Sequence, residues 1–221
     1  MKKYKFTGET KTIYLPFGTV TLHRIKAVVE FGLVKVGDLG GWIEKEENLS
    51  HEENAWVYGD AEVCGNAKVY GNAKVCGNAK VYGDAEVYGN AWVCGNAEVR
   101  GNAKVYGNAK VYGDAEVYGD AKVYGDAEVR GNAWVCGNAK VFSTDHVLVI
   151  GAIGSRNDFT TFFRDKDNEI TVKCGCFLGK IDKFLEKVTQ THKDTKHTLA
   201  YRTAVEVAKL QIDLTEKSTR R

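Results

Sequence analysis

The residues best suited to bind a ligand follow a short apolar run, Val147–Ile150, in the last third of the chain. The next eight residues are Gly-Ala-Ile-Gly-Ser-Arg-Asn-Asp. Their glycines let backbone N–H groups approach a ligand, and the arginine can pair with a phosphate or a carboxylate. The alternative is a plain glycine turn between two strands, followed by two threonines that serve as strand formers, one of them facing outward. We expect a small anionic ligand or a partner protein to be bound by Ser155, Arg156, Asn157, Thr160 and Thr161.

A second group of reactive side chains combines two thiols with two imidazoles. Cys174 and Cys176 alternate onto one face of a predicted strand, and His192 and His197 flank the loop between two predicted helices. Four such ligands could hold zinc, but Cys-x-Cys is not the usual ligand spacing. Buried core thiols and a reactive thiol pair are the other interpretations. Neither a metal nor a cofactor is predicted.

A six-residue repeat dominates the architecture that must position these side chains. From Val57 to Lys140 the chain repeats Val-x-Gly-(Asn or Asp)-Ala-x without a gap, which gives fourteen units. Within Ala-x-Val-x the side chains alternate as in a strand, so alanine and valine fill an interior. Glycine followed by asparagine or aspartate tolerates the positive φ of a corner. Each unit therefore adds one short strand and one corner to a coil.

This pattern resembles the hexapeptide repeat of left-handed parallel β-helices. The resemblance implies the left hand and three units per coil, so the fourteen units give between four and five coils. The entry sequence, with Leu22–Ala27, Phe31–Glu44 and Asn48–Ser50, is similar to that of the YdcK-like bacterial and prophage proteins. Trp42 and Leu49 can cover the unpaired edges of the first coil. The expected fold is mainly β: a left-handed parallel β-helix with an N-terminal cap and a small C-terminal α+β domain.

The functions associated with hexapeptide β-helices need histidines. The acyltransferases use a histidine base near an extruded loop, and one class of carbonic anhydrase binds a metal with three histidines. The repeats contain no histidine and no inserted loop, and His51 and His146 only flank them. We therefore expect no enzyme, but an oligomeric scaffold whose β-helix displays the C-terminal binding domain. The alternatives are a phage-encoded inhibitor that binds a host defence protein or a nucleotide signal, and an acyltransferase-like enzyme with its site in the C-terminal domain.

Residues 18 apart stack on neighbouring coils, and one outward column is aromatic. It contains Tyr70, Tyr88, Tyr106, Tyr124 and Phe142. It is either a stabilising ladder or a subunit interface, because contiguous exposed aromatic patches usually mark contacts. β-Helices of this kind are commonly trimers, so we favour a homotrimer. In another column Cys76 and Cys94 are neighbours, and we expect them to stay thiols in a reducing cytoplasm.

Composition limits the partners and the location. The net charge is +2 and the outward charges of the repeat are mixed in sign, which argues against a nucleic-acid groove. No apolar run is long enough to cross a membrane, and the N-terminus lacks an apolar signal sequence. The expected location is a bacterial cytoplasm, or the host cytoplasm if a phage encodes the protein.

Four segments result from these patterns. Residues 1–50 are expected to form a hairpin and cap, 51–142 the β-helix, 143–214 an α+β domain of three strands and two helices, and 215–221 a frayed tail.

Overall fold

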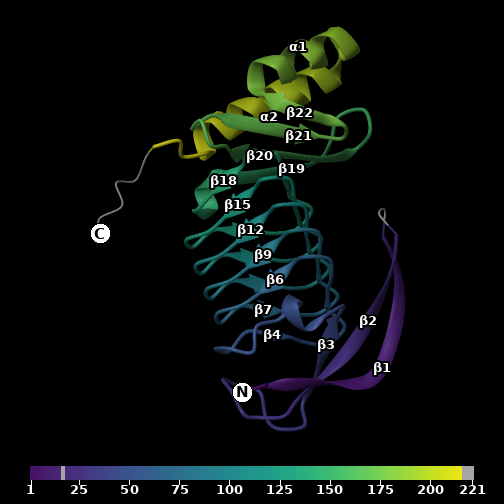
Figure 1. The fold of residues 1–221 in the computed structure, drawn as a ribbon. Helices are drawn as coiled ribbons and strands as arrows, with labels where there is room; N and C mark the ends of the chain where they lie inside the picture. Colours follow the sequence, from purple (N-terminus) through teal and green to yellow (C-terminus); the bar gives the residue numbers. More distant parts are fainter. Residues whose placement is uncertain (16–17, 216–221) are drawn as a thin grey trace.

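A computed structural model of the chain describes residues 1–15 and 18–215, so all but the first residue of the expected frayed tail lies outside the described residues. The molecule is elongated, with the N-terminal cap at one end of a β-helix and the C-terminal domain at the other (Figure 1). No helix of the described residues is long and apolar enough to cross a membrane.

The repeat forms a parallel β-helix, as the sequence predicts. Each unit contributes a two-residue strand that pairs in parallel with the strand 18 residues away, for example Lys104 with Glu86 and Val105 with Val87. The strands are β4 (Trp56–Val57), β5 (Glu62–Val63), β6 (Lys68–Val69), β7 (Lys74–Val75), β8 (Lys80–Val81), β9 (Glu86–Val87), β10 (Trp92–Val93), β11 (Glu98–Val99), β12 (Lys104–Val105), β13 (Lys110–Val111), β14 (Glu116–Val117), β15 (Lys122–Val123), β16 (Glu128–Val129), β17 (Trp134–Val135) and β18 (Lys140–Val141).

The interior of the β-helix is a column of valine and alanine. Every valine and alanine of the repeat is at most 2% exposed, whereas the residue between them points outward. The corners use glycines with φ between 61° and 77°, the left-handed region that glycine adopts without strain. The asparagine side chains at the corners also connect neighbouring coils. For example, Asn72 Nδ2 donates a hydrogen bond to Asn90 Oδ1 over 3.2 Å. The inward and outward register predicted from the repeat is confirmed.

The cap joins the β-helix earlier than the repeat begins. After β1 (Tyr4–Leu15) and β2 (Gly18–Ala27), strand β3 (Leu39–Ile43) pairs in parallel with β5, and η1 (Glu46–Asn48) leads into the next corner. One sheet therefore runs β3-β5-β8-β11-β14-β17, and the coil makes about six turns. Leu49 is buried and pairs with Val69, so it continues the interior of the β-helix. Trp42 pairs with the outward residue Glu62 and is buried in a cluster with Leu22 of β2, so it does not cover the first coil as expected.

Strands β1 and β2 form a long arm that leaves the cap beside the β-helix (Figure 1). Its inner residues Ile13, Leu15 and Val20 pack with Trp42 and Tyr82 in one apolar cluster. Strands β1 and β2 pair antiparallel and so form a hairpin within residues 1–50.

The C-terminal domain covers the other end of the β-helix. After η2 (Thr144–His146), strands β19 (Val147–Ile153), β20 (Asp158–Arg164), β21 (Ile170–Cys174) and β22 (Phe177–Lys180) form an antiparallel sheet in sequence order. Helices α1 (Ile181–His192) and α2 (Lys196–Gln211) cover one face of this sheet, and the last coil covers the other (Figure 1). The sequence predicted three strands; β22 is the fourth, and glycines around it obscured its alternation.

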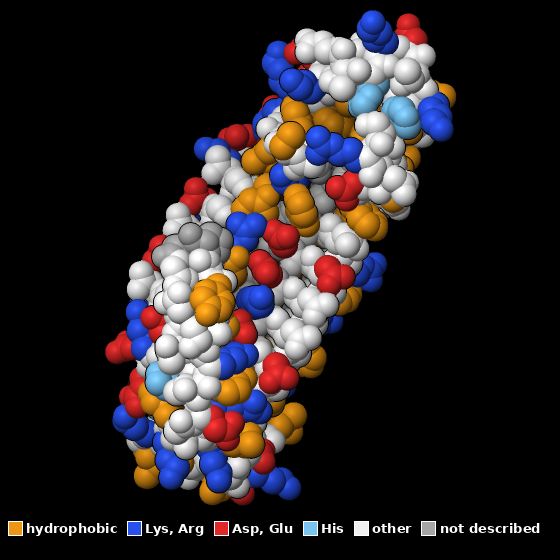
Figure 2. All heavy atoms as spheres, turned by 90° about the vertical axis from the view of Figure 1, so that its right-hand side faces the viewer, with side chains coloured by type: hydrophobic (Ala, Val, Ile, Leu, Met, Phe, Trp, Pro, Cys, Tyr) orange, Lys and Arg blue, Asp and Glu red, His pale blue; other side chains and the backbone are white. Residues whose placement is uncertain are grey.

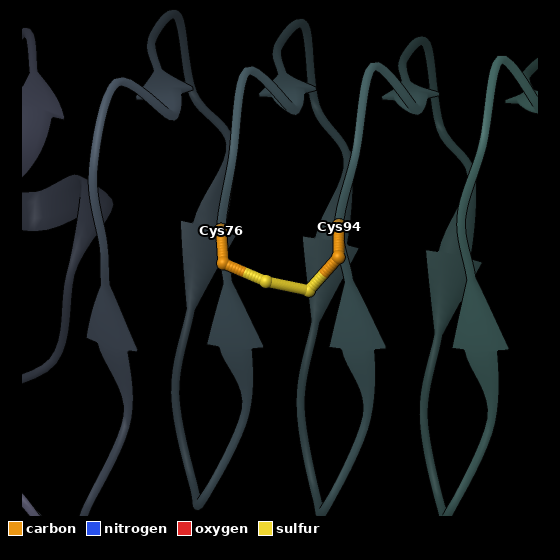
Figure 3. The surroundings of a disulfide bond; sticks show 2 residues. All are labelled: Cys76 and Cys94. Carbon is orange, nitrogen blue, oxygen red and sulfur yellow. A yellow bond between two sulfur atoms is a disulfide. The ribbon is translucent and has the colours of Figure 1, made fainter.

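The structure joins Cys76 and Cys94 by a disulfide between neighbouring coils, with their Cα atoms 4.6 Å apart (Figure 3). The expectation of free thiols at these two positions is wrong. The stacking that the repeat imposes brings the two Cα atoms within the range that a disulfide requires.

Candidate functional site

The aromatic column forms a continuous stack. The ring centroids of Tyr70, Tyr88, Tyr106 and Tyr124 follow each other at 4.8–4.9 Å with nearly parallel planes, and Phe142 follows at 5.3 Å. The stack ends under the buried guanidinium of Arg164, which lies 4.7 Å from the ring centroid of Phe142. The tyrosines themselves stay half-buried, so their outer edges remain accessible.

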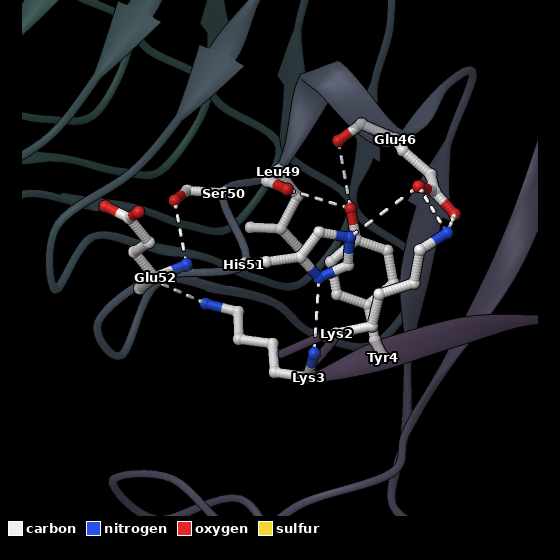
Figure 4. A network of polar contacts seen from close by, with 8 residues as sticks. All are labelled: Lys2, Lys3, Tyr4, Glu46, Leu49, Ser50, His51 and Glu52. Atoms are coloured by element: carbon white, nitrogen blue, oxygen red, sulfur yellow. Dashed lines mark hydrogen bonds and ion pairs between the residues drawn. The ribbon is translucent and has the colours of Figure 1, made fainter.

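His51, which precedes the repeat, is occupied by the N-terminal cap (Figure 4). Its Nδ1 accepts a hydrogen bond from the backbone N–H of Lys3 over 3.3 Å, and its ring stacks on Tyr4 at 4.2 Å. The proton of the neutral ring is therefore on Nε2, which lies 3.8 Å from a carboxylate oxygen of Glu46. Burial lowers the pKa of His51. With its lone pair already used, His51 cannot accept a proton from a substrate.

His146, which follows the repeat, has a structural environment as well. It is completely buried, and its Nδ1 accepts the backbone N–H of Phe142 over 3.2 Å. Its ring meets that of Phe142 edge to face at 4.1 Å. His146 thus fastens the end of the β-helix to the C-terminal domain. The two histidines nearest to the repeat are both explained by the fold.

The ligand-binding residues predicted around the glycine turn are separated by the structure. Ser155, Arg156 and Asn157 lie exposed in the turn between β19 and β20, whereas Thr160 and Thr161 are both buried on β20. The expectation that one threonine faces outward is wrong, because both faces of the sheet are covered. Their placement as ligand-binding residues stays a prediction.

The two threonines have different partners. Thr160 Oγ1 donates to the sulfur of Cys174 over 3.3 Å, on the helix side. Thr161 Oγ1 accepts the backbone N–H of Trp134 over 3.0 Å and thereby continues the hydrogen bonding of the last coil. Thr160 therefore belongs to a polar cluster, and Thr161 to the junction with the β-helix.

Cys174 is the centre of that cluster. Its thiol lies 3.8 Å from the hydroxyl of Tyr201, a buried residue of α2. Burial raises the pKa of Tyr201 to about 12, so the phenol keeps its proton at neutral pH. His192 stacks on the ring of Tyr201 at 6.0 Å, and His197 lies 5.8 Å from His192. One thiol, one phenol and two imidazoles thus form a connected group.

Glycines bring the predicted turn against this cluster. Gly154 has φ +75°, and a Cβ there would lie 1.9 Å from the hydroxyl of Tyr201. Gly175, at the next turn, would place a Cβ 3.3 Å from Nη1 of Arg156. The Arg156 guanidinium therefore lies over the turn that immediately follows Cys174.

The second thiol is not part of the cluster. Strand β21 ends at Cys174, and the turn at Gly175 leaves Cys176 exposed, so the two thiols do not share a strand face as predicted. Within the described residues there is no group of three or more His, Cys, Asp and Glu side chains that could hold a metal ion. Tyr201 was missed from the sequence because nothing local links it to a residue 27 positions earlier.

A short segment of the chain is similar to a curated bacterial protein. No family model matches the chain. A segment of 62 residues is 39% identical to the "Uncharacterized acetyltransferase YdcK" of Escherichia coli (strain K12) and covers 26% of this chain. The segment spans 19% of that relative's length. Because the relative is named as an acetyltransferase, the match contradicts the expectation that this chain is not an enzyme.

Proposed function

We propose that the protein is an acyltransferase-like enzyme whose reacting groups lie in the C-terminal domain, with the β-helix as its platform. The relative named as an acetyltransferase supports the class of reaction. The location is supported by the histidines: the repeats have none, and His51 and His146 are used by the fold. His23 lies on β2 against the ring of Phe6. His192 is half-buried beside Tyr201, and His197 lies 5.8 Å from His192.

The observation that carries this proposal is the contact of the Cys174 thiol with Thr160 and Tyr201. In acyl transfer, the sulfur attacks an acyl carbonyl, a thioester bond forms, and the leaving group departs with a proton. The Thr160 hydroxyl and the protonated Tyr201 phenol can donate to the sulfur or to the carbonyl oxygen. In this proposal His192, whose ring stacks on that of Tyr201, accepts the thiol proton. Arg156 would pair with an anionic part of the acyl donor.

The test is release of thiol from an acetyl thioester, with trapping of the acyl group on the protein. Cys174→Ala should lower the rate by at least about 100-fold, and Tyr201→Phe by roughly 10-fold. Cys176→Ala is the matched control, because this thiol is two residues away and exposed, and it should leave the rate unchanged. Peptide mass spectrometry should find the acyl group on Cys174. Full activity of Cys174→Ala would overturn the assignment.

We also propose that three copies assemble through the tyrosine column. The outer edges of Tyr70, Tyr88, Tyr106 and Tyr124 form one accessible aromatic surface, and closed cyclic symmetry would bury it. Tyr88→Glu should give a monomer by light scattering at micromolar concentration. Tyr112→Glu, on another column, should remain a trimer. A monomeric parent protein would refute this assembly.

A further inference from the structure

A groove of about 540 Å³ runs along one face of the β-helix, away from the C-terminal cluster. Its lining residues come from three successive coils: Tyr82, Gly83, Glu98, Arg100, Gly101, Glu116, Tyr118 and Gly119. At about 4.8 Å per coil, the floor is about 10 Å long. This volume is in the range of small-ligand sites.

The fold encloses this groove from both ends. The outward column that contains Tyr82, Arg100 and Tyr118 begins with Cys64 and ends with Cys136, and both cysteines are buried. The arm packs over the lower end, where Tyr82 joins its apolar cluster. At the upper end Lys173 of the C-terminal domain lies 5.0 Å from the ring of Trp134, two residues before Cys136 in the chain. Figure 2 shows acidic and basic side chains together on the hollowed surface between the arm and the C-terminal domain.

The charges on the floor are arranged around Arg100. Its Nη2 donates to Glu116 over 2.7 Å, its Nε lies 3.8 Å from Glu98, and its guanidinium lies 4.1 Å from the ring centroid of Tyr118. The hydroxyl of Tyr82 donates to Glu98 over 3.0 Å. Strands β11 and β14 place Glu98 and Glu116 directly side by side, and Arg100 compensates a like-charge pair that would otherwise be unfavourable.

This arrangement leaves hydrogen-bonding capacity of both kinds in the groove. Among the described residues, Arg100 donates one hydrogen bond with its five N–H groups, and each of the two carboxylates accepts one. An anion would meet the two carboxylates, and a cation would meet the guanidinium. A neutral ligand with several hydroxyl groups can instead accept from Arg100 and donate to Glu98 and Glu116 at once.

We propose that this groove binds a neutral saccharide of a few sugar units. The acceptors Glu98 and Glu116 follow each other at the coil spacing with the donor Arg100 beside them, which suits a ligand whose hydroxyl groups also repeat along its length. This site is independent of the Cys174 cluster, so its test does not depend on acyltransferase activity.

The test uses maltotriose, cellotriose and chitotriose as probes for saturation-transfer NMR and calorimetry with the full chain. At least one should bind saturably, and its affinity should stay within about twofold between about 50 and 500 mM NaCl, because no net charge is neutralised. Glu98→Ala, Glu116→Ala and Arg100→Gln should each weaken it roughly tenfold or more.

Glu86→Ala provides the matched control. Glu86 accepts from Tyr70 and pairs with Lys104 in an equivalent network on another face of the β-helix. This variant should bind the saccharide like the parent protein and melt at a temperature similar to that of Glu98→Ala. Absence of binding by all three probes would overturn the proposal, as would equal losses in Glu86→Ala and Glu98→Ala. Competition by spermidine or inorganic phosphate would also refute it, since it would show a charged ligand.

Discussion

Two corner glycines with the same backbone conformation allow the contact between coils to be measured by itself. Gly107 and Gly131 have φ of +71° and +63°. An alanine at either position adopts a left-handed conformation, which costs about 1–2 kcal/mol and is partly offset by the lower entropy of the unfolded chain. At Gly131 nothing lies within 4 Å of the added Cβ. Gly131→Ala should therefore lower the free energy of unfolding by about 1 kcal/mol.

Gly107→Ala carries an additional steric cost. Its Cβ would lie 2.9 Å from the backbone nitrogen of Gly125 on the next coil, so the two corners must move apart. That movement lengthens the 2.8 Å hydrogen bond from Asn108 N to Gly125 O. Overpacking and the weakened hydrogen bond together should add about 2 kcal/mol to the loss at Gly131.

Urea unfolding followed by tryptophan fluorescence measures both losses. For a chain of this size, about 2 kcal/mol corresponds to a difference of about 4–8 °C in melting temperature. Equal losses in the two variants would show that only the conformation of the corner matters, and that neighbouring coils do not press on each other as described.

Four further predictions follow from the described contacts. Val105→Asp buries an unpaired charge in the core and should lower the free energy of unfolding by several kcal/mol. Lys104→Ala breaks a surface ion pair with Glu86 and should lower it by less than about 1 kcal/mol. Equal effects in urea unfolding would contradict the inward and outward register. Because the pKa of His51 is lowered in the folded state, the unfolded state binds more protons just below the ordinary value of 6.5. The free energy of unfolding should therefore fall as the pH drops through that range. His51→Asn keeps an acceptor for Lys3 and should make the melting temperature nearly independent of pH between about pH 6.5 and 5. The pKa of Glu46 is lowered from 4.5, so its contribution is lost only at lower pH and does not interfere. Reduction of the disulfide between Cys76 and Cys94, which are 18 residues apart, should lower the stability by about 2–3 kcal/mol, and the reductant should have no effect on Cys76→Ala. Arg156→Lys should weaken binding of an anionic acyl donor, because Lys lacks the planar guanidinium of Arg. The melting temperature should stay nearly unchanged, because Arg156 is exposed. A melting temperature lower by many degrees would show that Arg156 stabilises the fold instead.

The sequence by itself determined the β-helix and much of its surface. A strict period of six fixes which residues are buried, as at Val105, and a spacing of 18 fixes which side chains are neighbours, as in the stack of Tyr70 and Tyr88. These relations could be predicted because each coil contacts only the next one, so local pattern and tertiary contact carry the same information. The same spacing of 18 makes Glu98 and Glu116 neighbours on adjacent coils.

Only the tertiary structure decided how the parts outside the repeat are used. It placed β3 on the first coil, packed the arm beside Tyr82, and assigned His51 to the cap. It also covered both faces of the C-terminal sheet, which buried Thr160 and brought Tyr201 of α2 to Cys174. These contacts join segments with no common period, and they depend on how separate elements pack rather than on any local preference of the chain.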